Sequence, residues 1–379
     1  MSSDRPVLET RDLRVVRGGV EVLDISEFAV HEGEVVCVVG PNGAGKTTLL
    51  QALCCLLRPS RGEIVFRGQR IETEYPVLQY RRRVAMVFQE ALLFDSTVYN
   101  NVASGLKLRG LHGSKVRESV EEQMERFGIA HLRDRSARKL SGGEAQRTSL
   151  ARAFAIKPEI IFLDEPFASL DQPSRESLMD DLQRILKRTN TAAFFATHDR
   201  IEALRLANRI AVMDEGTILQ VGTPAEVMNH PANEFVASFV GVETILHGIV
   251  IEQNGGSLVT VVSATRVEAL GDANVGEHVL LCVRPENVVL ATRRQDEGVS
   301  SRNVYQGQVK KVIPMGPYFK VQLDCGFPIT SYVTAHSLEG MSIQEGKTLT
   351  ASFKATAVHV IRNPQSMEQS LDQSINKGH

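Results

Sequence analysis

The sequence predicts an α/β domain with a largely parallel sheet, followed by a smaller all-β region. Short apolar runs alternate with helical stretches over residues 7–240, the order expected when helices cover both faces of a parallel sheet. The runs 160–163 and 192–196 are continuously apolar, as strands buried on both faces are. Beyond residue 240, short strand-like runs such as 258–262 and 278–283 dominate. A chain of 379 residues also exceeds one ordinary core, so two or more domains are expected.

Composition indicates a folded protein that does not itself span a membrane. Apolar residues make up 42% of the chain and charged residues 23%. The net charge of -2 gives no reason to expect nucleic acid as a partner. No apolar stretch is long enough to cross a bilayer, and the N-terminus lacks an apolar signal core, which predicts a cytosolic location. The five cysteines are scattered and are expected to be buried as small hydrophobic residues.

Residues 40–48 form a glycine-rich turn between an apolar strand, 35–39, and the start of a helix. They match the phosphate-binding pattern G-x-x-x-x-G-K-[ST], in which main-chain N–H groups point inward around an anion. Lys46 is expected to contact the β- and γ-phosphates, and the Thr47 hydroxyl to ligate magnesium. The predicted loop residues are Gly40, Pro41, Asn42, Gly43, Ala44, Gly45, Lys46, Thr47 and Thr48.

Polar side chains also follow three other apolar runs. Asp164 and Glu165 end one of them; Asp164 is predicted to hold magnesium through water, and Glu165 to act as the general base. Gln89 ends another and could reach magnesium and water, while His198 ends a third and could touch the γ-phosphate. Solvated acids, a structural glutamine and a structural histidine are the alternatives for each taken alone, so the prediction depends on their order along the chain.

Residues 140–147, Leu-Ser-Gly-Gly-Glu-Ala-Gln-Arg, predict a second anion site at the start of a helix. One chain does not need two such sites for one triphosphate. If two copies pair head to tail, Ser141, Gly142 and Gly143 of each copy contact the γ-phosphate held by the other. Asp171, which follows the acids, is then expected at the shared interface, and dimer closure depends on ATP.

This ordered set resembles the ATP-binding cassette (ABC) family. The match covers residues 8 to about 240: Walker A at 40–48, the Q-loop at Gln89, the signature at 140–144, Walker B at 160–164, the D-loop at 169–171 and the switch at His198. The resemblance implies a P-loop NTPase cassette over residues 1–240, with a helical subdomain at about 90–145, that binds ATP and Mg²⁺ and hydrolyses ATP. The family usually stacks adenine on an aromatic shortly before Walker A. Residues 15–19 hold none, so Arg17 over the base or Val16 against it is expected instead.

The stretch 89–102 resembles the importer-type segment after the Q-loop, where a groove receives a short helix of a permease. Packing within the helical subdomain is the alternative for these apolar residues. Because the chain lacks a membrane span, the resemblance implies separate permease subunits, an extracytoplasmic binding protein as an indirect partner, and a peripheral position on the cytoplasmic face of the membrane. A soluble, non-transport ABC ATPase is the alternative of another class, but neither a long coiled coil nor a second Walker A is present.

Residues 241–363 resemble the TOBE domain, an oligomer-binding-type barrel attached to importer ATPases. The turn at 283–288, Val-Arg-Pro-Glu-Asn-Val, carries this resemblance, and it occurs with sugar, polyamine, sulfate, iron and molybdate systems. Two related OB-like halves are expected, at about 243–291 and 300–363, followed by a polar tail at 364–379.

The second half resembles the molybdate-binding, Mop-like variety of this barrel. In that variety a Ser-x-Arg-Asn stretch and a Lys-Ala-Thr stretch bind a tetrahedral oxyanion at a barrel interface. The matching residues are Ser300, Ser301, Arg302, Asn303, Lys354, Ala355 and Thr356. The resemblance implies import of molybdate or tungstate, with sulfate, sugars and polyamines as alternatives. The barrel is expected to sense cytosolic oxyanion and hold the cassettes apart; storage of the oxyanion, or dimerisation alone, are the alternatives.

Overall fold

The computed structural model describes residues 6–292 and 301–362. The chain forms two compact units, Met1–Pro224 and Ala225–His379. The domain boundary predicted at 240 falls inside the second unit, and the predicted tail at 364–379 lies outside the described residues. Within those described ranges, no helix has the length and apolar character needed to cross a membrane.

The first unit is built on a six-stranded sheet with the strand order β10-β9-β3-β8-β7-β6. Its strands are β3 (Val35–Val39), β6 (Val84–Val87), β7 (Ile160–Asp164), β8 (Ala192–Thr197), β9 (Arg209–Asp214) and β10 (Thr217–Gly222). All neighbouring pairs are parallel except β9 with β10. Every residue of β3, β7 and β8 is buried, which explains the continuous apolar runs in the sequence.

A second, antiparallel sheet of four strands, in the order β2-β1-β4-β5, shares its core with the first. Its strands are β1 (Leu8–Arg17), β2 (Val20–Val30), β4 (Arg61–Phe66) and β5 (Gln69–Arg70). Helix α1 (Lys46–Leu53) packs between the sheets, because Leu49, Leu50 and Leu53 are completely buried in this shared core. Helix α2 (Val77–Arg83) leads into β6.

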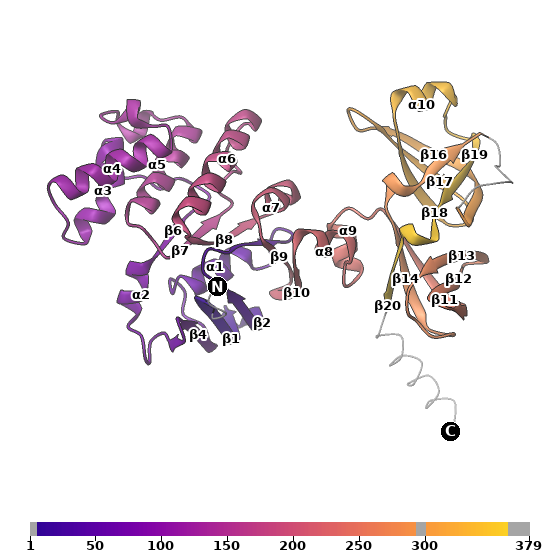
Figure 1. The fold of residues 1–379 in the computed structure, drawn as a ribbon, viewed down its shortest axis with the longest axis horizontal. Coiled ribbons are helices and arrows are strands. Elements are labelled where there is room, and N and C mark those ends of the chain that lie inside the picture. The colour runs from indigo at the N-terminus through magenta and orange to yellow at the C-terminus, as the bar shows by residue number, and fades with distance from the viewer. Residues whose placement is uncertain (1–5, 293–300, 363–379) are drawn as a thin grey trace. The chain divides into compact units, whose positions relative to one another are not determined.

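A helical arm lies beyond β6 and β7 (Figure 1). It consists of α3 (Val98–Leu108), α4 (Ser114–Arg126) and α5 (Gly142–Ala155), which pack on one another, with short 3-10 turns at Ala130–Leu132 and Ala137–Lys139. Two further helices, α6 (Gln172–Thr189) and α7 (Arg200–Leu206), follow β7 and β8 and contact each other. The α/β organisation predicted for this part of the chain is confirmed.

The second unit begins with α8 (Pro224–Asn229) and α9 (Glu234–Phe239) and continues as two five-stranded sheets, in the orders β13-β12-β11-β14-β20 and β15-β19-β16-β17-β18. The strands are β11 (Thr244–Asn254), β12 (Ser257–Val262), β13 (Thr265–Leu270), β14 (His278–Val283), β15 (Val289–Ala291), β16 (Asn303–Pro314), β17 (Phe319–Asp324), β18 (Pro328–Val333), β19 (Thr348–Phe353) and β20 (Val358–Arg362). One helix, α10 (Ala335–Gly340), lies between β18 and β19. The region predicted as all-β is confirmed as β-rich, with α10 as a helix that the sequence analysis did not predict.

The two sheets of the second unit exchange strands, which the predicted halves did not anticipate. Strand β20, from the end of the second half, pairs with β14 of the first sheet, and β15, from the end of the first half, pairs with β19 of the second. Both sheets therefore contribute to one hydrophobic core. Short apolar strands do not specify their partners in the sequence, so the exchange was not readable from it.

Candidate nucleotide-binding site

The phosphate loop leaves the end of β3 and enters α1 in a backbone shape that requires glycine at two positions. A Cβ atom at Gly40 would lie 2.1 Å from the carbonyl oxygen of Met213, in the neighbouring strand β9. Gly45 adopts φ +100° as the N-cap of α1, and a Cβ there would lie 2.9 Å from the side chains of Leu23 and Met213. The loop backbone therefore packs directly on β9, where a side chain at either glycine would not fit.

Lys46 and Thr47 begin α1 beneath this loop. The Lys46 ammonium is largely buried and donates hydrogen bonds to the carbonyl oxygens of Gly40 and Pro41, each at 2.9 Å. Burial lowers the pKa of Lys46, and the carboxylates of Glu165 and Asp164 partly oppose this. A buried cation beside the main chain of the loop provides strong binding for a phosphate anion.

The residues predicted to bind magnesium are consistent with that ion. Thr47 Oγ1 donates to Asp164 Oδ1 at 3.0 Å, and Asp164 is 6% exposed, with its pKa raised by burial. Within the described ranges, no group of three or more His, Cys, Asp or Glu side chains could hold a metal ion. Magnesium in phosphate sites is commonly bound by one or two protein groups, the substrate phosphates and water. Thr47 and Asp164 fit that pattern.

Glu165 and His198 contact each other across the ends of β7 and β8. His198 Nδ1 and Glu165 Oε2 are 2.8 Å apart. Glu165 has a positive φ of 44°, and its N–H donates to the Ala196 carbonyl oxygen at 2.9 Å. The carboxyl ends of parallel strands are the usual place for ligands in such sheets, and here they carry Glu165 and His198, two of the three predicted catalytic side chains, of which Gln89 is the third.

A cavity of about 510 Å³ lies in front of the phosphate loop. Of the predicted residues, those that line it are Asn42, Gly43, Gly45, Lys46, Thr47, Thr48, Gln89 and Glu165. Sequence reasoning missed the other lining residues, which are Val20, Glu21, Val22, Glu215 and Gly216. They come from the start of β2 and from the turn between β9 and β10, and no residue type there indicated a ligand.

The adenine contact proposed for Arg17 or Val16 is not evident in this cavity. Arg17 Nη2 donates to Gln51 Oε1 at 3.0 Å, and the Val16 N–H donates to Ser60 Oγ at 2.9 Å. Among the described residues that line the cavity, Val20, which is 64% exposed, and Val22 offer apolar surface.

The signature residues lie apart from this cavity. Ser141 caps α5: its Oγ accepts from the Glu144 N–H at 3.3 Å, and its own N–H donates to Glu144 Oε2 at 2.8 Å. A Cβ at Gly142 would lie 3.6 Å from the Ser169 carbonyl oxygen, so the signature and the D-loop are neighbours. Asp171 is the N-cap of α6 and accepts from the Ser174 N–H at 2.8 Å. As the described residues define it, the cavity is lined by none of Ser141, Gly142, Gly143 and Asp171.

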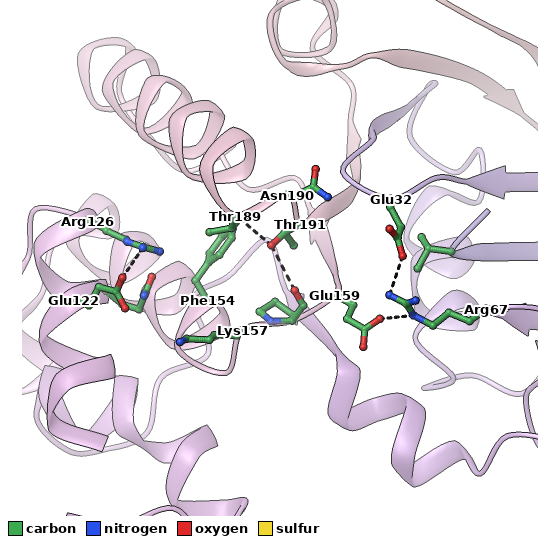
Figure 2. Close-up of a pocket in the computed structure, with 13 residues that line it drawn as sticks. Glu32, Arg67, Glu122, Arg126, Phe154, Lys157, Glu159, Thr189, Asn190 and Thr191 are labelled. Carbon is green, nitrogen blue, oxygen red and sulfur yellow. Dashed lines mark hydrogen bonds and ion pairs between the residues drawn. The ribbon is translucent and has the colours of Figure 1, made fainter. Parts of the chain in front are cut away.

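A second cavity, of about 420 Å³, lies at the opposite ends of β7 and β8 (Figure 2). Its acidic and basic side chains are largely paired. Arg67 lies between Glu159, at 2.7 Å, and Glu32, at 2.9 Å, and Arg126 contacts Glu122 at 2.5 Å. Paired charges and the lack of a glycine-rich loop among the lining residues make it unsuitable for a triphosphate.

The predicted oxyanion residues lie at one end of the second sheet, where β16 and β19 pair Asn303 with Phe353. Asn303 is 1% exposed, and its amide bonds both the N–H and the C=O of Glu268 at 2.8 Å. Arg302 contacts the Glu268 carboxylate at 3.2 Å. Lys354 and Thr356 are exposed, and Ser300 lies outside the described residues. Within the described part of the set, Arg302 and Asn303 are engaged with β13.

The comparisons with known proteins agree with this site. A family model described as ABC transporter matches residues 23–168, and one described as TOBE domain matches residues 281–361. The chain is 38% identical to the molybdate/tungstate import ATP-binding protein WtpC of Pyrococcus horikoshii, over 88% of this chain and 94% of that one. It is 32% identical to the sulfate/thiosulfate import ATP-binding protein CysA of Thermosynechococcus vestitus, with 86% and 90% covered. The spermidine/putrescine import ATP-binding protein PotA of Ruegeria pomeroyi is also 32% identical, with 94% and 96% covered.

The chain belongs to the import ATP-binding proteins of the ABC transporter family. It is therefore an ATP-hydrolysing subunit that binds ATP with Mg²⁺, and the predicted cassette fold, activity and cofactors are confirmed. Among solved structures, the cbiO1 subunit of Clostridium perfringens matches this ABC subunit with a TM-score of 0.55 and 30% identity, covering 63% of this chain and 95% of that one. A dimeric ATP-binding cassette bound to ADP and Pi matches with a TM-score of 0.53 and 25% identity, covering 57% of this chain and 98% of that one.

Proposed function

We propose that this subunit hydrolyses ATP as a head-to-tail homodimer docked on permease subunits, and that it energises uptake of molybdate or tungstate. One observation supports the dimer: the phosphate loop and Glu165 line one cavity, whereas Ser141, Gly142 and Gly143 lie elsewhere on the same chain. A second copy would bring its signature residues to the γ-phosphate. The solved dimer bound to ADP and Pi, which shares the cassette fold, supports this arrangement.

The proposed mechanism follows from the positions of five side chains. Lys46 binds the β- and γ-phosphates, and the loop N–H groups hold them in place. Magnesium, when bound, would offset phosphate charge, with Thr47 and Gln89 as direct ligands and Asp164 holding it through water. Glu165 takes a proton from water as the water oxygen attacks the γ-phosphorus, and the bond to the ADP oxygen breaks.

His198 is proposed to turn from Glu165 toward the γ-phosphate when both sites are filled. Its imidazole is 58% exposed, while the Glu165 carboxylate is 13% exposed, so the imidazole has the greater freedom to move. Leaving Glu165 frees the carboxylate oxygen that accepts the proton. Closure of the dimer would thereby prepare the base only when the partner's signature loop is in place.

Replacement of the base tests this mechanism. Glu165→Gln keeps the shape but removes the proton acceptor, so turnover should fall by about 10²–10⁴-fold while ATP binding persists. The variant should accumulate as a dimer with Mg²⁺ and ATP in size-exclusion chromatography with light scattering. Full hydrolysis by a strictly monomeric wild-type preparation, with Ser141→Ala equally active, would refute the shared site.

The proposed permease contact rests on the segment before α3. Leu92 and Phe94 are apolar and are 59% and 55% exposed. Arg152 holds the segment from α5, by donating to the Leu92 carbonyl oxygen at 2.8 Å and by lying 5.7 Å from the centre of the Phe94 ring. An exposed apolar pair on a fixed backbone suits a short permease helix on the cytoplasmic face of the membrane. Co-purification with membranes through a permease would separate this function from that of a non-transport ATPase.

Molybdate or tungstate is proposed as the cargo on two grounds. The identity to molybdate/tungstate import proteins is 36–38%, against 32–33% for sulfate/thiosulfate and 32–35% for spermidine/putrescine import proteins. The Mop-like residues of the second unit form the other ground. Sulfate remains the first alternative, with polyamines and sugars behind it. The neighbouring genes should encode a permease and an extracytoplasmic binding protein, and the oxyanion selectivity of that binding protein would identify the cargo.

Regulation by oxyanion is proposed to use Lys354. This lysine is exposed, so an anion could bind its ammonium while Asn303 keeps its contacts. Arg302 could join it by leaving Glu268, since that pair is exposed. Equilibrium dialysis of the purified chain with molybdate, tungstate and sulfate tests the site. Lys354→Met should abolish binding, and Lys311→Met, an exposed lysine of the same unit, should not. Absence of binding to the wild type at millimolar molybdate would leave dimerisation as the role of the barrel.

A further inference from the structure

Arg175, in the first turns of α6, reaches the loop that carries His198. Its Nη1 lies 2.9 Å from Asp199 Oδ2, and its Nε lies 3.8 Å from Glu202 Oε1. Both acids come from the segment that begins α7, whose N-cap is Asp199. The Arg175 and Asp199 side chains are 24% and 26% exposed, and Glu202 is 4% exposed. The ion pair between Arg175 and Asp199 is thus largely shielded from water, unlike most ion pairs on a protein surface.

The same acids fix the backbone on both sides of His198. Thr197 Oγ1 donates to Glu202 Oε2 at 2.6 Å, and the Asp199 N–H donates to Thr197 Oγ1 at 3.0 Å. Arg175 holds the Asp199 carboxylate of this set. His198 therefore extends from a loop whose two flanking residues are tied to buried or half-buried partners, while its own ring contacts Glu165 at 2.8 Å.

The other end of this connection is the signature loop. The Arg175 N–H donates to the Asp171 carbonyl oxygen at 2.9 Å, so Arg175 sits one turn into the helix that follows the D-loop. At Gly143 a Cβ would touch Leu170 and Ser174, at 3.7 and 3.9 Å. The N-terminus of α6 therefore packs on the signature loop, and its first turns hold the His198 loop.

We propose that Arg175 is a positioning residue, which places His198 for hydrolysis and couples the His198 loop to the signature loop of the same chain. The coupling rests on the proposed homodimer, in which the signature loop serves the partner's nucleotide and His198 serves the chain's own. A shift of α6 on binding of the partner's nucleotide is then transmitted through Arg175 to the chain's own γ-phosphate contact. This links the two sites of the dimer through one side chain.

Arg175→Met tests the proposal, because it keeps much of the packing and removes the charge. We expect kcat to fall by about 30-fold or more, the Kd for ATP to stay within about threefold, and the Hill coefficient for ATP to approach one. Arg175→Lys should recover part of the rate. The matched control is Arg205→Met, which removes an exposed ion pair, Arg205 to Asp180 at 2.7 Å, between the same two helices. The control should stay within about twofold of the wild type.

A double-variant cycle separates positioning from general loosening. If Arg175 acts through His198, then Arg175→Met in a His198→Ala background should lower kcat no further than about twofold. Equal losses in both backgrounds would overturn the proposal, as would an Arg175→Met variant within threefold of the wild type in kcat. Should Arg175→Met fail to fold, Asp199→Asn removes the same pair and keeps an N-cap. The ATPase rate of Ser141→Ala is measured alongside. An active Ser141→Ala variant would refute the proposed dimer. An inactive Ser141→Ala variant together with an unchanged Arg175→Met variant would refute only the role of Arg175.

Discussion

Asn303 connects the two sheets of the second unit by hydrogen bonds, and its replacement by alanine should lower the local stability of that contact. The side chain leaves β16 and bonds the backbone N–H and C=O of Glu268 in β13, while Tyr305 donates to its Oδ1 at 2.9 Å. Alanine leaves both Glu268 groups without these partners. Each buried, unsatisfied backbone group costs about 1–3 kcal/mol. Because β13 is an edge strand and Glu268 is half-buried, water recovers part of this, so a loss of ~2–4 kcal/mol is expected.

Hydrogen exchange read by mass spectrometry measures this locally, without requiring the two units to unfold as one. A loss of ~2 kcal/mol corresponds to exchange about 30-fold faster in peptides that span β13 and the start of β16. The ATPase rate should change little. Gln308→Ala is the matched control, because its side chain is exposed on the same strand and bonds the Gly346 carbonyl oxygen at 3.3 Å. If Asn303→Ala exchanged like the wild type but lost molybdate binding, the side chain would serve an anion and the reasoning here would be wrong.

Three further predictions concern single residues. Gly40→Ala should lower the free energy of unfolding by ~2–4 kcal/mol in thermal unfolding, because the new Cβ would lie 2.1 Å from the Met213 carbonyl oxygen. A variant as stable as the wild type would contradict the close packing on β9. Ser141→Ala should lower the free energy of unfolding by about 1 kcal/mol in denaturant titration, because α5 loses its cap. The fall in kcat should be larger than this loss of stability alone explains. Burial lowers the pKa of His359 in the folded chain below its ordinary value of 6.5. As the pH drops, His359 therefore binds a proton in the unfolded chain before it does so in the folded chain, and the free energy of unfolding should fall below about pH 6.5. His359→Gln should flatten this dependence in calorimetry at several pH values.

The predictable parts of the site are those whose residues form short contiguous motifs in the sequence. The phosphate loop is recognisable because its glycines and Lys46 must follow one another in the chain, and Glu165 because it directly follows a buried strand. The turns that supply Val20 and Glu215 to the cavity carry no such pattern, because any residue can provide backbone and surface there. The partners of Asn303 were unpredictable for another reason. Glu268 lies on the other sheet, and sequence alone does not specify which strands of two similar sheets become neighbours.

Helix α6 contacts both the signature helix α5 and the loop that carries His198. Arg147, on the signature helix α5, contacts Asp181 of α6 at 2.5 Å and donates to Ser177 Oγ at 2.9 Å. Arg175 then joins α6 to the His198 loop. Both arginines are mostly shielded from solvent, so neither contact is readily replaced by water. In the proposed dimer, a shift of the signature loop toward the partner's nucleotide would change the contacts of α5 with α6, and a shift of α6 would change the support of the His198 loop. A chain built in this way would sense the partner's site through packing and charge, without a direct contact between the two nucleotides.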